Sequence, residues 1–118
     1  MKMINPTTYE KGLWAEKFAK LYLRLKRYRF HQSRFKTAVG EIDLITETND
    51  CIVFVEVKMR RSHQQAAYAV TPQQQKRLQN TALVYLQKYP THKKVRFDVL
   101  LVNRHQFPIH LKNVLWSE

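Results

Sequence analysis

The sequence has a single cysteine and no long apolar run, and each shortage excludes a class of protein. Cys51 is the one cysteine among 118 residues, so it cannot form an internal disulfide, and no CxxC or Cys/His cluster of the zinc-binding kind is present. No segment approaches the ~20 apolar residues that a membrane-spanning helix needs. The first residues, MKMINPTTYEKG, lack the apolar core of a signal peptide. We therefore expect a cytoplasmic protein that has no membrane partner.

Acidic residues are scarce relative to basic ones. Nine Asp and Glu oppose 21 Lys and Arg, which gives a formal net charge of +12. Such an excess attracts polyanions, and nucleic acid is the obvious one because each neutralised phosphate releases a counterion. The alternative is a basic surface without a specific ligand. The length, with no repeat and no low-complexity linker, predicts one domain over residues 1–118.

Apolar periodicity predicts an α/β fold in the order helix, three strands, helix, and one or two strands. The first helix is expected from about Tyr9 to Lys26 and the second after the cap Thr71-Pro72-Gln73-Gln74. The strands are expected at about 28–36, 41–47, 52–59, 95–102 and 109–116, with a loop over 60–70. The long helical connection between residues 59 and 95 permits a parallel crossover, so we expect a mixed sheet flanked by helices.

The first predicted helix carries two apolar stripes on nearly opposite sides. One stripe contains large residues: Trp14, Phe18, Leu21, Tyr22 and Leu25. The other contains smaller ones: Gly12, Ala15, Ala19 and Leu23. We expect both sides of the helix to be covered, with a sheet approaching closely along the smaller residues. Glu16 borders this second stripe.

Four charged residues interrupt the two clearest strands: Glu41, Asp43, Glu56 and Lys58. A hairpin symmetric about Asn49-Asp50 places Asp43 directly opposite Glu56, and Glu41 opposite Lys58. Because side chains two apart on a strand share a face, all four lie on one face, away from the turn. The opposite face is wholly apolar and is expected to form the core: Ile42, Leu44, Val53, Val55 and Val57.

Two opposed carboxylates raise each other's pKa unless a cation lies between them. Mg²⁺ prefers oxygen ligands and usually binds through one or two carboxylates while keeping several waters. Asp43 and Glu56 supply such a pair, and Lys58 could orient or deprotonate a metal-bound water or stabilise charge on a phosphate. This set is typical of phosphodiester hydrolysis. The alternative is an exposed sheet face with ordinary cross-strand Glu–Lys pairs.

Basic residues near this cluster are candidates for holding the phosphates that flank a scissile bond: Arg60, Arg61, Lys76 and Arg77. The alternative for each is simple solvation at the surface. Asp98 is expected to pair with Arg96, because alternation along the strand puts the two on the same face.

At these residues the sequence resembles the PD-(D/E)xK nuclease superfamily, whose core motif is an Asp near the end of one strand and Glu-x-Lys on the next. Asp43 and Glu56-Val57-Lys58 match that motif. The sequence is more similar to one branch, the YraN family of predicted endonucleases, which is itself similar to archaeal Holliday junction resolvases. Further matching residues are Gly12, Glu16, Ala19 and Leu23, the run 40–45, Val53, Phe54, Val55, Arg60, Lys76, Ala82 and the run 96–98.

The resemblance implies a restriction-endonuclease-like fold, with a mixed β-sheet between two helices. It implies that Asp43 and Glu56 bind Mg²⁺ or Mn²⁺, with the Val57 carbonyl as a further candidate ligand. Lys58 would be the catalytic lysine, and Glu16 would reach the site from the first helix. Two departures stand out: Ile42 replaces the namesake proline, and residues 62–67 lack the glycine that relatives often carry.

We therefore expect a metal-dependent endonuclease that acts on DNA rather than RNA, with branched or damaged DNA as candidate substrates. Resolvase-like relatives pair, so a homodimer stays open. A first alternative is a nucleic-acid-binding module with the same fold and no chemistry of its own. A second is a protein-interaction domain whose charge is incidental.

Overall fold

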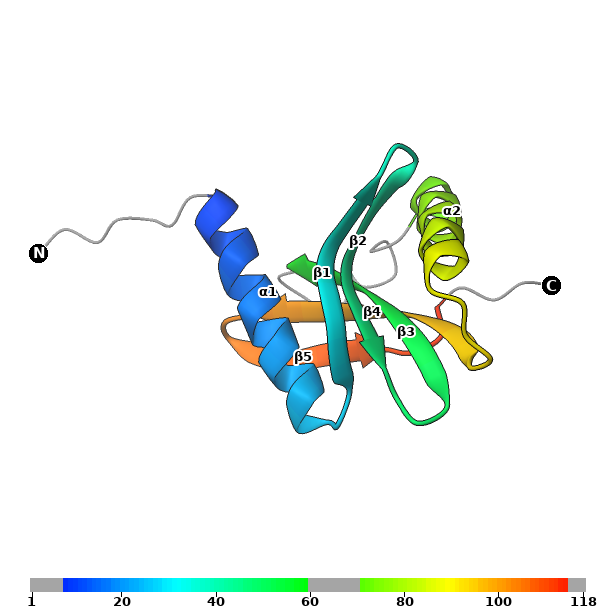
Figure 1. Cartoon of the computed structure of the whole chain (residues 1–118). Coiled ribbons are helices and arrows are strands. Elements are labelled where there is room, and N and C mark those ends of the chain that lie inside the picture. Colours follow the sequence, from blue (N-terminus) through cyan, green and yellow to red (C-terminus); the bar gives the residue numbers. More distant parts are fainter. Residues whose placement is uncertain (1–7, 60–70, 115–118) are drawn as a thin grey trace, which may run out of the picture.

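The computed structural model describes residues 8–59 and 71–114, which form two helices and five strands (Figure 1). In chain order these elements are α1 (Thr8–Leu25), β1 (Arg29–Thr37), β2 (Gly40–Glu47), β3 (Cys51–Met59), α2 (Pro72–Lys88), β4 (Lys94–Asn103) and β5 (Gln106–Leu111). The predicted order of helices and strands is therefore confirmed. The loop predicted over 60–70 lies outside the described residues. Neither described helix is long and apolar enough to cross a membrane.

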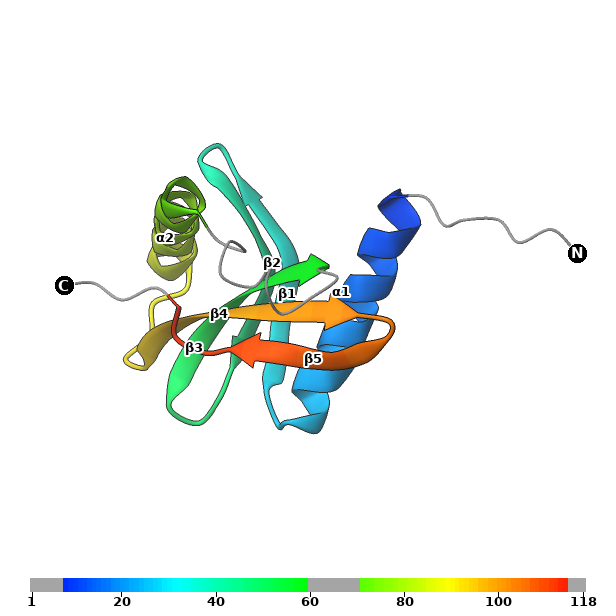
Figure 2. The same cartoon turned by 180° about the vertical axis from the view of Figure 1, so that it is seen from behind.

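The five strands form one mixed sheet in the order β1-β2-β3-β4-β5. Neighbours pair antiparallel except β3 and β4, which are parallel and are connected through the segment that contains α2. This is the crossover that the connection length permitted. Figures 1 and 2 show β1 and β2 crossing steeply over β3, β4 and β5, so the sheet is strongly twisted.

Helix α1 covers one face of the sheet through its small residues. Ala15, Ala19 and Leu23 are buried against a cluster that includes Val53 and Val55 of β3. Their short side chains let the helix axis approach the sheet, as the sequence predicts. The large-residue stripe is covered only in part: Trp14, Phe18 and Tyr22 pack against the same cluster, whereas Leu21 and Leu25 are exposed. The expectation that both sides of this helix are covered is therefore wrong along that edge, because the sheet lies on one side of it.

Helix α2 covers the opposite face and begins as its sequence predicts. The Thr71 hydroxyl accepts a hydrogen bond from the Gln74 amide, and the Gln74 side chain accepts one from the Thr71 amide. The helix packs closely on the β1–β2 turn, where a Cβ on Gly40 would lie 2.6 Å from the Thr81 hydroxyl. The buried residues of α2 are Leu78, Thr81, Ala82 and Tyr85.

The sheet therefore has a core on each face, which corrects the prediction of one apolar face. Ile45 and Phe54 are fully buried in the α2 cluster, and Ile42 lies with them rather than with Leu44. The alternation of β2 is interrupted at Asp43, which lies between the Phe35–Ile42 and Ser33–Leu44 pairs of the β1–β2 register, as Arg34 does on β1. Arg34 has a left-handed backbone, with φ of 52°, and this irregularity explains why the pattern of β2 changes face there.

The last strand starts earlier than the sequence predicts. It covers Gln106–Leu111 instead of about 109–116, and residues 115–118 lie outside the described chain. Gln106 pairs with Asn103 across a short turn, and Pro108 is tolerated because β5 is an edge strand. The apolar pattern did not indicate the start of this strand, because Gln106 is polar and Pro108 is uncommon in strands.

Candidate functional site

The β2–β3 hairpin has the alignment that the sequence predicts. Leu44 pairs with Val55 and Glu47 with Ile52, around the turn at Asn49-Asp50. The ladder ends at Leu44 and Val55, so Asp43 and Glu56 are the next residues beyond the last pair. The predicted pairing of Glu41 with Lys58 is not part of this ladder; Glu41 lies opposite Lys36 of β1 instead.

The Asp43 carboxylate is fixed to β3 just beyond the ladder. The Val57 amide donates to Asp43 Oδ2 at 2.8 Å, so a side chain serves as acceptor where a neighbouring strand would otherwise supply a carbonyl. Asp43 also lies close enough to Glu56 to raise the pKa of Glu56 through a hydrogen bond and through its negative charge. The two acids predicted to oppose each other therefore interact.

Contact between the two acids strongly perturbs Glu56. Burial raises the pKa of Glu56 to about 9, with further upward contributions from the hydrogen bond and the negative charge of Asp43. The charge of Lys58 lowers the pKa and that of Glu41 raises it, so all four predicted residues interact electrostatically. At neutral pH the raised pKa therefore favours the protonated form of Glu56.

A pocket of about 380 Å³ opens beside Asp43, between α1 and the ends of β2 and β3. Its wall contains four of the residues to which the resemblance assigns a role, namely Glu16, Asp43, Val57 and Lys58, whereas Glu56 is not among the residues that line it. Arg34 also lines the pocket. No residue pattern indicated Arg34, because its place depends on a left-handed backbone inside a strand.

Glu16 stands on the pocket wall with its charge already paired. Its carboxylate accepts from Arg34 Nε at 2.8 Å and lies 3.2 Å from Lys20 Nζ. Burial would raise the pKa of Glu16, but the hydrogen bonds of Arg34 and Lys20 outweigh burial and lower it. Within residues 8–59 and 71–114, no group of three or more His, Cys, Asp and Glu side chains is placed to hold a metal ion. Asp43 and Glu56 form a two-acid site, and Mg²⁺ commonly binds through that number of carboxylates.

The two predicted phosphate contacts that the structure describes do not line this pocket. Lys76 and Arg77 are exposed on α2, which covers the other face of the sheet from α1. Arg60 and Arg61 lie outside the described residues. A role for any of these four residues in holding nucleic acid stays a prediction.

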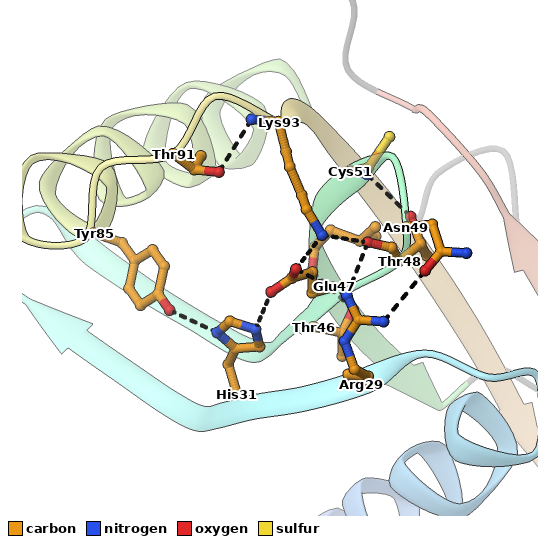
Figure 3. A network of polar contacts seen from close by, with 11 residues as sticks. Arg29, His31, Thr46, Glu47, Thr48, Asn49, Cys51, Tyr85, Thr91 and Lys93 are labelled. Atoms are coloured by element: carbon orange, nitrogen blue, oxygen red, sulfur yellow. Dashed lines mark hydrogen bonds and ion pairs between the residues drawn. The ribbon is translucent and has the colours of Figure 1, made fainter.

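Glu47, near the turn of the same hairpin, has the opposite surroundings (Figure 3). Its carboxylate accepts from Lys93, from Arg29 at 2.9 Å and from His31 at 2.6 Å. The hydrogen bond of Lys93, followed by that of Arg29, lowers the pKa of Glu47 to about 2. This acid is held by cations and is fully ionised.

Asp98 of β4 is similarly neutralised, although it is buried. It accepts from the Arg96 guanidinium at 2.8 and 2.9 Å, from His110 Nε2 at 2.7 Å and from the Asn113 amide at 3.0 Å. Burial would raise the pKa of Asp98, but these hydrogen bonds lower it. The predicted Arg96–Asp98 pair is confirmed, and the contrast leaves the Asp43–Glu56 pair without comparable compensation.

Fold and site together define a mixed α/β protein with five strands, two helices and a pair of interacting acids, one of which lines a pocket that also carries two cations. The chain belongs to the family described as "Uncharacterised protein family UPF0102", whose model matches residues 15–102. That match includes Glu16, Asp43, Glu56 and Lys58.

Curated relatives of similar length support the family assignment. A UPF0102 protein of Nitrobacter winogradskyi is 44% identical over 105 residues, which cover 87% of this chain and 89% of the relative. One of Bradyrhizobium sp. strain BTAi1 is 45% identical, covering 87% of this chain and 77% of the relative. One of Rhodopseudomonas palustris is 42% identical, covering 87% and 81%.

Proposed function

We propose that the protein is a metal-dependent endonuclease of the PD-(D/E)xK type, which hydrolyses phosphodiester bonds in DNA. The observation that carries this proposal is the interaction of the Asp43 and Glu56 carboxyls, since Asp43 raises the pKa of Glu56 and lines a pocket. Two acids in contact are unfavourable unless they share a proton or a cation. Lys58 lines the same pocket, which completes the acid–acid–lysine set of the motif.

Asp43 and Glu56 would hold Mg²⁺ or Mn²⁺, and the resemblance adds the Val57 carbonyl. The pair fits a divalent cation because its shared proton marks a place where positive charge is favourable. A bound ion of this kind would polarise a phosphate oxygen and lower the pKa of a coordinated water.

The chain's own side chains have separate tasks in this proposal. The Val57 amide holds Asp43 in position, so one carboxylate is oriented before any ligand arrives. Lys58 and Arg34 bring two cations to the pocket wall, where they stabilise negative charge on a phosphate. Arg34 and Lys20 keep Glu16 ionised.

The architecture and the charge support the same proposal. The order α-β-β-β-α-β-β around one mixed sheet is the one that the restriction-endonuclease-like resemblance implies. The net charge of +12 suits a polyanionic substrate. Branched or damaged DNA, rather than RNA, follows from the resemblance to resolvases.

The direct test is cleavage of linear and four-way-junction DNA with Mn²⁺ or Mg²⁺. We expect Asp43→Asn and Lys58→Ala each to lower the cleavage rate at least about 100-fold. Glu47→Gln is the matched control, because it neutralises an acid of the same hairpin outside the pocket, and it should retain activity. Cleavage that survives both pocket substitutions would show that this site does not catalyse it.

A second candidate function is nucleic-acid binding without chemistry. The engagement of Glu16 by Arg34 and Lys20 favours it, because the third acid of the expected set is already paired. Salt-dependent DNA binding in a protein that binds neither Mn²⁺ nor Mg²⁺ would select this function. An absence of nucleic-acid affinity at physiological salt would instead favour a protein-interaction domain.

A further inference from the structure

A second pocket, larger than the first, lies along α1 and the start of β1. Its volume is about 810 Å³, and no acid lines it. We call it the basic groove after its five cations: Lys17, Lys20, Arg24, Arg27 and Arg29. Charge of a single sign along one helix and its following turn suits an extended polyanion.

Three of these cations have no acidic partner among the residues that the structure describes. Lys20 is paired with Glu16, and Arg29 with Glu47 (Figure 3). Among the described residues, no acid forms an ion pair with Lys17, Arg24 or Arg27. The groove therefore has positive charge available for phosphate groups.

The groove also exposes apolar surface between its charges. Leu21 is 55% exposed and Phe30 51% exposed, and both line the groove. The Lys20 ammonium lies 5.0 Å from the centre of the Phe30 ring. Cations that track a backbone, together with an exposed aromatic ring for stacking, are the combination that binds single-stranded nucleic acid.

Arg27 occupies a backbone position that favours glycine. It follows the end of α1 with φ of 70°. The Tyr28 amide donates to the Leu23 carbonyl at 2.9 Å, and the Arg27 amide to the Arg24 carbonyl at 3.0 Å, which is a Schellman-type helix end. A side chain in this conformation is strained, yet the position carries a groove cation.

The basic groove adjoins the candidate catalytic pocket. Lys20 lines the groove, Glu16 lines the pocket, and the two residues are paired on successive turns of α1. We propose that the basic groove binds a single-stranded segment of nucleic acid and leads it to the Asp43–Glu56 site. Binding of the single strand by the groove does not depend on the proposed function, whereas its delivery to a cleavage site rests on that function.

The test measures fluorescence anisotropy of a 12-nucleotide oligo(dT) and a 12-base-pair duplex over a salt series, with EDTA present so that no cleavage occurs. We expect wild-type protein to prefer the single strand. Arg27→Gly should reduce the slope of log K against log salt by about 0.7, with an unfolding midpoint unchanged or raised. Phe30→Ala should weaken binding about five- to hundredfold with an unchanged slope.

The matched control is Lys88→Gln, which removes an exposed cation from α2 on the opposite face. It should change neither affinity nor slope. The inference is overturned if wild-type protein binds no oligonucleotide, if Arg27→Gly and Phe30→Ala bind as wild type does, if Lys88→Gln weakens binding equally, or if the duplex binds as tightly as the single strand.

Cleavage separates this inference from the proposed function. If the binding results are as expected but Mn²⁺ and Mg²⁺ produce no cleavage, nucleic-acid binding by the basic groove is supported and the nuclease proposal is rejected. If DNA is cleaved while the groove substitutions leave binding unchanged, only the proposed role of the basic groove is rejected.

Discussion

The two ends of the β2–β3 hairpin treat their carboxylates in opposite ways. Near the turn, hydrogen bonds from Lys93 and Arg29 lower the pKa of Glu47 to about 2. At the far end, burial and contact with Asp43 raise the pKa of Glu56 to about 9. Both acids lie on the same pair of strands, so the difference arises from their neighbours and not from secondary structure.

This difference shows what a structural acid looks like in this protein. Glu47 and the buried Asp98 are each surrounded by cationic or amide donors. The chain has 21 Lys and Arg against nine Asp and Glu, which is more than enough to pair every acid with a cation. Glu56 nevertheless interacts with another acid, Asp43, which raises its pKa. The pair differs in this way from the acids that the fold stabilises, and it is the place where we propose that a cation binds.

Removing a compensated buried acid should have the largest effect on stability. Asp98→Ala leaves Arg96 and His110 without their partner in the interior. We expect a loss of about 3–5 kcal/mol in the free energy of unfolding, measured by urea denaturation at pH 7. A loss below about 1 kcal/mol would show that Asp98 does not anchor this network.

Neutralising the uncompensated acid should have the opposite sign. Because the folded pKa of Glu56 is about 9 and its ordinary value 4.5, the unfolded chain ionises first. Stability of the wild type should therefore fall as pH rises from about 4.5 to about 9. Glu56→Gln removes that loss, so without metal it should be more stable than the wild type at pH 8 by roughly 1–3 kcal/mol.

Urea unfolding at pH 5 and pH 8, in EDTA, measures this difference. At pH 5 the difference between the variant and the wild type should be much smaller, because pH 5 lies only just above the ordinary pKa of Glu56 and most of the loss develops at higher pH. A wild-type stability that stays level between these two pH values would contradict a raised pKa for Glu56.

The smallest effect is expected at Glu47. Its lowered pKa means that its contribution is present above pH 4.5 and is lost as pH falls toward about 2. Glu47→Gln should cost at most about 1 kcal/mol at neutral pH, since the site is near the surface and screened by salt. Thermal unfolding in low and high salt measures this, and the difference between variant and wild type should shrink at high salt.

Much of this hairpin could be predicted because local rules determine it. Asn49-Asp50 marks the turn, and a fixed turn with period-two strands sets the register that brings Asp43 beside Glu56. The capping box at Thr71 likewise predicts the start of α2. These features are determined by residues that are close together in the sequence, so the sequence pattern is enough to predict them.

Other parts of the site depend on tertiary contacts that no local pattern contains. The left-handed backbone of Arg34, inside β1, interrupts the alternation of β2 and brings a guanidinium to Glu16. The burial of Ile45 and Phe54 depends on α2 covering the face that these two side chains share. Strand alternation identifies which residues share a face and does not indicate how many faces are covered.

The central claim is that the Asp43–Glu56 pair holds a divalent cation in place of its shared proton. Calorimetric titration of Mn²⁺ at pH 7.5, in two buffers of different ionisation enthalpy, tests it most directly. The predicted result is binding with release of about one proton per ion in the wild type, and much weaker binding without proton release in Glu56→Gln. Absence of binding in the wild type, or equal binding in the variant, would contradict the claim.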